Sequence, residues 1–255
     1  MLPAMVARYA VLLIVFLPSF AWAGPPFVTD DPEPVEYQHW EINNYISGTR
    51  VRDETAATLP GSDINYGILP DVQAHINVTM AADASKGEPV YYGYGDTELG
   101  VKYRFIHETD WLPQVAIYPL LELPTGQVNH SLGDGQVREF FPVWMQKSFG
   151  PWMAFGGAGY WNNTETRNYW FEGAVLERKI TDSLTLGGEL FHQNANIYGG
   201  ETTRDFTAGN VTGFNLGGSY DLSENYHILF SAGQGIEDIS ASNQFSYYVA
   251  LQLTY

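Results

Sequence analysis

The sequence predicts an all-β protein, a single transmembrane antiparallel β-barrel of about twelve strands. Three observations lead to this fold class: about twelve candidate strands, links that alternate in length, and an aromatic last residue. Along residues 247–255, one strand face is apolar and ends on Tyr255, whereas the other face carries Gln252 and Thr254, because successive side chains point to opposite sides. This pattern is typical of the closing strand of an outer-membrane barrel, with lipid on one face and water on the other.

The candidate strands follow one another along almost the whole chain after its amino-terminal end. Most have about the ten residues that a tilted transmembrane strand requires. Apolar and polar side chains alternate cleanly in the third and fourth strands. In the sixth to eighth strands they do not: Trp144 and Gln146 share a face, and so do Glu172, Leu176 and Arg178, so the inward side stays unassigned. The strands are expected at roughly residues 38–47, 62–68, 71–81, 96–105, 113–123, 137–148, 152–161, 169–180, 183–192, 211–221, 226–235 and 244–255.

The links between these strands alternate between long and short. Outer-membrane barrels show this pattern, with short periplasmic turns and longer external loops. An even number of strands would also return both chain ends to the periplasm. The long links are residues 48–61, 82–95, 124–136, 162–168, 193–210 and 236–243; the short ones are 69–70, 150–151, 181–182 and 222–225, with 106–112 intermediate.

Three parts are predicted along the chain. Residues 1–23 have a basic start at Arg8, an apolar run too short to span a bilayer, and small residues before Gly24, which together indicate a secretory signal peptide. Residues 24–37 form a proline-rich, acidic amino-terminal segment that is expected to lie outside the sheet, because proline is excluded from a sheet interior. The segment is also expected to be periplasmic. We expect this segment to fold into or under the barrel and narrow it as a plug. Residues 38–255 form the barrel itself.

Composition excludes several classes of function. The chain carries 12 Lys and Arg against 29 Asp and Glu, a net charge of −17, which argues against nucleic acid as a partner. It has no Cys, so disulfides and thiolate metal sites are excluded. No His pair has metal-ligand spacing and no nucleotide-binding loop is present. We therefore expect no metal, no cofactor and no energy coupling.

Polar side chains on the inward faces of the better strands are the candidate pore-lining residues. They could line an aqueous path and bias which solutes pass, or form a buried polar network that holds the barrel closed. In the second case, Lys102 and Arg104 beside Glu98 would be ion pairs. The predicted residues are Glu41, Asn43, Gln73, His75, Asn77, Glu98, Lys102, Arg104, Glu122, Glu189, Gln252 and Thr254.

The sequence predicts no enzyme. The only residues that could serve an outer-membrane hydrolase with an external-rim site are His192 and the adjacent His130 and Ser131, and nothing in the sequence positions a base against a nucleophile. A structural or adhesive barrel without transport is the other alternative. Trp40, Tyr103, Phe105, Tyr118 and Tyr255 are expected to be girdle aromatics at the lipid interface.

Five stretches are distributed over most of the chain after residue 23: residues 24–41, 95–105, 121–126, 142–150 and 184–190. They resemble a family of bacterial outer-membrane proteins named for the meta-pathway of phenol degradation. The resemblance implies a transporter-like barrel in the bacterial outer membrane that passes small solutes, including aromatic or hydrophobic ones, by passive diffusion. The expected partners are outer-membrane lipid, a small-molecule solute and, through the carboxyl-terminal strand, the barrel-assembly machinery.

Overall fold

The structure is a computed structural model that describes residues 25–195, 210–237, 239 and 243–255. The predicted signal peptide at 1–23 lies outside the described residues, as does most of the link predicted at 193–210. Within the described ranges, no helix is long and apolar enough to cross a membrane.

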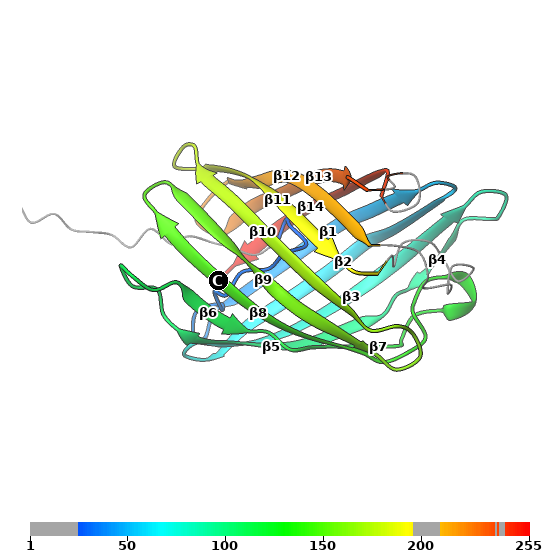
Figure 1. Cartoon of the computed structure of the whole chain (residues 1–255), viewed down its shortest axis with the longest axis horizontal. Helices are drawn as coiled ribbons and strands as arrows, with labels where there is room; N and C mark the ends of the chain where they lie inside the picture. Colours follow the sequence, from blue (N-terminus) through cyan, green and yellow to red (C-terminus); the bar gives the residue numbers. More distant parts are fainter. Residues whose placement is uncertain (1–24, 196–209, 238, 240–242) are drawn as a thin grey trace, which may run out of the picture.

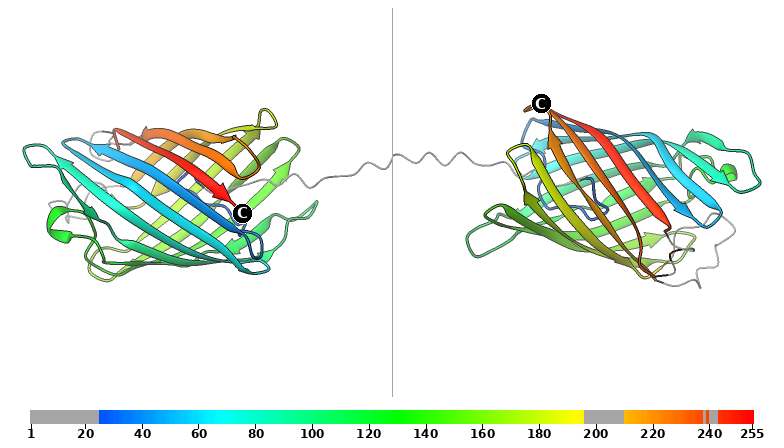
Figure 2. Two further views of the ribbon diagram at one scale, coloured as in Figure 1. Left: turned by 180° about the vertical axis from the view of Figure 1, so that it is seen from behind. Right: turned by 90° about the horizontal axis from the view of Figure 1, so that it is seen from above.

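The chain forms a closed antiparallel β-barrel (Figures 1 and 2). Fourteen strand segments follow one another round the ring, and β1 pairs with β14 to close it. Two barrel strands are interrupted: β4 and β5 both pair with β3, and β6 and β7 both pair with β8. Fourteen segments less two interruptions give twelve barrel strands, which confirms the predicted fold. The segments are β1 (Trp40–Val51), β2 (Glu54–Leu69), β3 (Val72–Ser85), β4 (Tyr91–Tyr94), β5 (Thr97–Ile106), β6 (Gln114–Ile117), β7 (Leu120–Leu123), β8 (Arg138–Phe149), β9 (Trp152–Asn163), β10 (Tyr169–Lys179), β11 (Leu184–Gln193), β12 (Val211–Asp221), β13 (Tyr226–Gly235) and β14 (Phe245–Thr254).

The prediction of a long first loop, between the first two strands, is wrong. Residues 48–61 are mostly strand, because β1 continues to Val51 and β2 begins at Glu54, leaving a tight turn of two residues. The ladder here pairs Arg50 with Thr55. Backbone hydrogen bonds do not depend on apolar side chains, so a hairpin can continue with polar residues beyond the apolar part of its strands. The two long strands therefore extend the barrel at the end opposite to the chain termini.

The outer face of the barrel is apolar. Strand register places Ile42, Ile64, Ile76 and Leu99 side by side on four neighbouring strands. Similar exposed residues continue round the ring, and none of them has another protein element to cover it. In water such a surface would be unfavourable, whereas a bilayer is its natural surroundings. Members of this outer face include Val78, Val101, Phe141, Val143, Met145, Leu176, Leu186, Leu190, Leu216, Val249 and Leu251.

Four of the five expected girdle aromatics are exposed: Trp40, Tyr103, Phe105 and Tyr255. The prediction for Tyr118 is wrong, because this side chain is buried in the barrel interior. Tyr118 follows β6, where Gln114 and Ala116 are also buried. It has the same parity as these residues and therefore points inward.

The structure also assigns the faces of the sixth to eighth barrel strands, β8, β9 and β10. Trp144 and Gln146 are buried and point inward, whereas Glu172, Leu176 and Arg178 are exposed and point outward. The inward face of β10 carries Tyr169, Phe171 and Val175, together with the buried Glu177. The middle of β8 is apolar on both faces, because the buried Phe140, Pro142 and Trp144 alternate with the exposed Phe141, Val143 and Met145. Alternation of polarity therefore could not reveal the orientation of these strands.

Candidate functional site in the barrel lumen

The amino-terminal segment, residues 25–37, crosses the interior of the barrel (Figures 1 and 2, dark blue). On one side, the backbone N–H of Thr29 donates to Glu189 Oε1 of β11 at 2.6 Å, and Ser231 Oγ of β13 donates to the Pro26 carbonyl at 2.6 Å. On the other side, the Val35 N–H donates to Gln73 Oε1 of β3 at 2.8 Å. Strands β3 and β11 lie about half a circuit apart, so the segment spans the lumen.

Two inward-facing cations hold the acidic residues of this segment. Lys102 Nζ lies 3.1 Å from Asp30 Oδ1 and 3.8 Å from Asp31 Oδ2. Arg104 lies 3.6 Å from Glu33, and it also pairs with Asp71 of the β2–β3 turn at 2.7 Å. The expected pairing of Lys102 and Arg104 with Glu98 is therefore wrong. The sequence could not reveal these pairs, because the partners are up to 72 residues apart.

Burial changes the acidity of the segment. Loss of hydration on burial raises the pKa of the Asp31 carboxyl well above its usual value. This effect outweighs the lowering of the pKa by the positive charge of Lys102. Desolvation likewise raises the pKa of Glu33, against the opposing effects of Gln114 and Arg104. A proton on either carboxyl therefore favours the docked segment.

Glu98 belongs to a second polar cluster on the wall formed by β2, β3 and β5. His75 Nε2 lies 3.0 Å from Glu98 Oε1, and His75 Nδ1 lies 3.0 Å from Asp63 Oδ1. Nearby, the Tyr45 hydroxyl donates to Asn77 at 3.1 Å. The imidazole is thus held between two carboxylates and cannot turn freely.

The remaining predicted residues also lie on the inward face. Asn43 Nδ2 donates to Glu41 at 3.3 Å, and Gln252 faces Asn43 across the β1–β14 seam. Arg138 pairs with Glu122 at 3.2 Å. All twelve predicted side chains therefore belong to a largely paired interior network. Buried in it are Asn43, Gln73, His75, Lys102, Glu189, Gln252 and Thr254.

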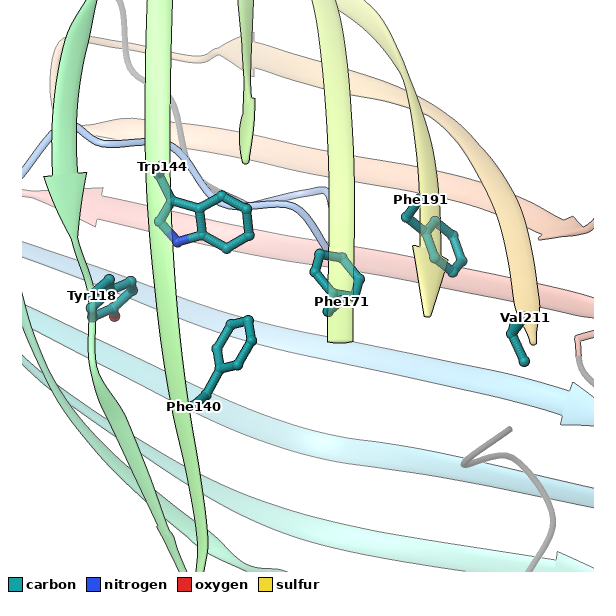
Figure 3. Close-up of a cluster of buried hydrophobic side chains, with 6 residues drawn as sticks. All are labelled: Tyr118, Phe140, Trp144, Phe171, Phe191 and Val211. Atoms are coloured by element: carbon teal, nitrogen blue, oxygen red, sulfur yellow. The ribbon is translucent and has the colours of Figure 1, made fainter. Parts of the chain in front are cut away.

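An aromatic cluster on the opposite wall was missed by the sequence analysis (Figure 3). Ring centroids of Phe140, Trp144 and Phe171 lie 6.3 Å apart in each pair. Trp161 stacks on Phe140 at 4.6 Å. The one available signal was the shared face of Trp144 and Gln146. The cluster consists of Tyr118, Phe140, Trp144, Phe171, Phe191 and Val211.

Two cavities lie on either side of the amino-terminal segment. The terminal cavity, about 320 Å³, lies at the end of the barrel that carries Trp40 and Tyr255. The central cavity, about 430 Å³, lies between the aromatic cluster and the His75 cluster. Pro25 and Asp30 of the segment line both cavities, so the segment forms the partition between them.

The residues considered for catalysis have other contacts. His192 Nδ1 lies 2.8 Å from the Thr212 hydroxyl. His130 stacks on Tyr91 with ring centroids 4.2 Å apart, and Ser131 follows it in a left-handed conformation. Within the described part of the chain, no group of three or more His, Asp or Glu residues is arranged to hold a metal ion.

No protein-family model matches the sequence, and no curated protein matches it. The fold is similar to that of an outer membrane channel from Pseudomonas putida F1, with a TM-score of 0.69 and 13% sequence identity over 88% of this chain and 98% of that one. It is also similar to the KdgM porin, with a TM-score of 0.55 and 10% identity over 84% of this chain and 99% of that one. At these identities the likeness concerns the fold. With its closed barrel and apolar outer face, the protein is located in the bacterial outer membrane.

Proposed function

We propose that the protein is an outer-membrane channel for passive diffusion of small solutes, with the amino-terminal segment as a plug. The observation that carries this proposal is the partition of the lumen. Cavities of about 320 and 430 Å³ lie on either side of a segment that contributes no strand to the barrel. Moving this segment would join the two cavities without breaking the barrel wall.

The aromatic cluster supports aromatic or hydrophobic compounds as solutes. Eight aromatic side chains line the central cavity, and five of them gather on one wall: Tyr118, Phe140, Trp144, Trp161 and Phe171. Apolar side chains turned toward a lumen disfavour strongly hydrated solutes and favour those that shed water easily. The opposite wall, with the predicted pore-lining residues, would set selectivity through its charge.

Two further parts of the proposal concern how the protein reaches the membrane. Residues 1–23 would direct secretion and be removed. The strand β14, ending next to Tyr255, would be recognised by the barrel-assembly machinery. We propose no catalytic activity: the Thr212 hydroxyl beside His192 donates to Glu237 at 3.2 Å and not to the imidazole, and His130 stacks on Tyr91.

A liposome-swelling assay tests the channel. Proteoliposomes containing the mature protein should swell in a series of phenolic compounds and swell more slowly in sugars of similar size. Removal of residues 25–34 should accelerate both. The channel proposal would be rejected if liposomes with the full mature chain and liposomes with the deletion variant both swelled no faster than empty liposomes.

A further inference from the structure

The central cavity contains polar groups that the barrel itself does not satisfy. The indole Nε1 of Trp144 is buried and has no hydrogen-bond partner among the described residues, and neither has the hydroxyl of Tyr248. Trp144 is 1% exposed, and both side chains line the central cavity. In Figure 3 the indole nitrogen is directed toward the gap between Tyr118 and Phe140, which line the same cavity.

An unsatisfied donor at this depth is unusual. Burying an N–H without an acceptor costs free energy, so buried polar groups in proteins nearly always have a partner. The indole N–H can only donate. A ligand that supplied an acceptor oxygen here would recover that cost, and its ring could pack edge-to-face on the aromatic cluster, as Phe171 already does with Phe140 and Trp144.

The charges of the cavity restrict the ligand further. Among the described residues that line it, the carboxylates are Asp63, Glu98 and Asp30, and the only titratable cation is His75. His75 is already held between Asp63 and Glu98, and Asp30 is paired with Lys102. The described lining thus offers no free cation to an anionic ligand. A carboxylate placed against Phe140 would face uncompensated negative charge in surroundings of low dielectric constant.

We propose that the central cavity is a binding site for uncharged aromatic molecules that bear a hydrogen-bond acceptor, with Trp144 as the residue that recognises the acceptor. Aromatic carboxylates are rejected by Glu98 and Asp63. This inference rests on the proposed channel function and names its solute class.

Binding to the protein in lipid nanodiscs tests this inference, with empty nanodiscs as the control for partition into lipid. Three probes of similar size separate the contributions: acetophenone has an acceptor, ethylbenzene has none, and benzoate is anionic. We expect acetophenone to bind roughly tenfold or more tightly than either of the others. Equal binding of all three would overturn the proposal.

Two conservative variants then assign the discrimination to residues. Trp144→Phe keeps the ring but removes the donor, so acetophenone should fall to the affinity of ethylbenzene. The matched control is Trp170→Phe on the outer face of β10, where the side chain is 55% exposed, and this change should leave acetophenone binding unaltered. Glu98→Gln should improve benzoate binding only. Undiminished acetophenone binding by a folded Trp144→Phe protein would overturn the proposal; should this variant fail to fold, the wild-type ranking of the three probes still decides it.

Swelling measurements separate this inference from the channel itself. Selective binding of acetophenone without flux into liposomes would support the site while rejecting the channel. Flux without any preference for the acceptor would leave the channel standing and overturn the site.

Discussion

Replacing Lys102 with Met should release the amino-terminal segment from the lumen. The ammonium group is the shared partner of Asp30 and Asp31 at 3.1 and 3.8 Å. The side chains of Lys102 and Asp31 are 5% and 0% exposed, so the substitution leaves carboxylates buried without a counter-charge. Removing one partner of a buried ion pair costs about 3–5 kcal/mol. Because Asp30 keeps 25% exposure, the lower figure applies, and the ratio of docked to released segment should fall roughly 100-fold.

Cysteine labelling measures this ratio directly, because the natural chain contains no Cys. The Thr29 side chain is fully buried while the segment is docked, so the cysteine of a Thr29→Cys protein should react slowly with a polar maleimide. Adding Lys102→Met should accelerate labelling by about two orders of magnitude. The matched control is Lys86→Met, which removes an exposed pair with Asp53 at the end of the barrel opposite to the chain termini and should have no effect. Equal labelling rates in the two backgrounds would refute the assigned role of Lys102.

Three further predictions concern pH, packing and the lipid face. The docked segment binds protons more tightly than the released one, since burial raises the pKa of Asp31 and Glu33. Docking should therefore be strongest below about pH 4 and weaken as the pH rises to the raised pKa values. The labelling rate of Thr29→Cys should then rise more steeply with pH than that of an exposed cysteine, whose rate rises only because its thiolate fraction grows. Gly173→Ala should displace the segment by a comparable route, because the added Cβ would overlap Thr29 Oγ1 and lie only 3.1 Å from Thr29 Cβ, an atom that the cysteine at position 29 retains. Overpacking costs about 1–3 kcal/mol, so labelling should rise roughly 5- to 100-fold. Leu216→Arg, at the middle of β12 and 64% exposed, should lower the free energy of unfolding in lipid vesicles by about 2–4 kcal/mol.

Each of these predictions has a control or a contrary result. Labelling that rises no more steeply with pH than that of an exposed cysteine would contradict the sign of the carboxyl effect. Gly188→Ala is the packing control, since its Cβ would meet the lipid-facing Leu216 side chain at 3.2 Å and the Asn215 carbonyl at an ordinary 3.7 Å, and labelling should stay unchanged. Leu216→Ala should cost less than Leu216→Arg in vesicles; equal losses for the two would mean that this face does not contact lipid.

The barrel could be predicted from the sequence because its wall obeys local rules. Alternation in strands such as β3 fixes which side chains face lipid. Link lengths were a weaker guide, since the long link expected at residues 48–61 is a two-residue turn between β1 and β2. The two strand breaks, at β4–β5 and β6–β7, did not disturb the count, because each break lies within one barrel strand. Where both faces were apolar, as along residues 140–145 of β8, alternation carried no information, and the aromatic cluster stayed hidden.

The interior pairs could not be predicted, for a different reason. Glu98 and Lys102 are near neighbours in sequence, yet Lys102 bonds to Asp30 and Glu98 to His75. These partners meet only because the amino-terminal segment enters the lumen. Its proline content and acidity indicated a non-strand element, but the choice of partners depends on the depth to which it docks, which no local pattern encodes.

Single-channel recording in planar bilayers tests the plugged barrel most directly. The full mature protein and a variant lacking residues 25–34 are compared under identical salt and voltage. We predict low conductance for the full protein and a clearly higher, stable conductance for the variant, because the terminal and central cavities would then be continuous. Equal conductance of the two proteins would contradict the proposal that residues 25–37 close the lumen.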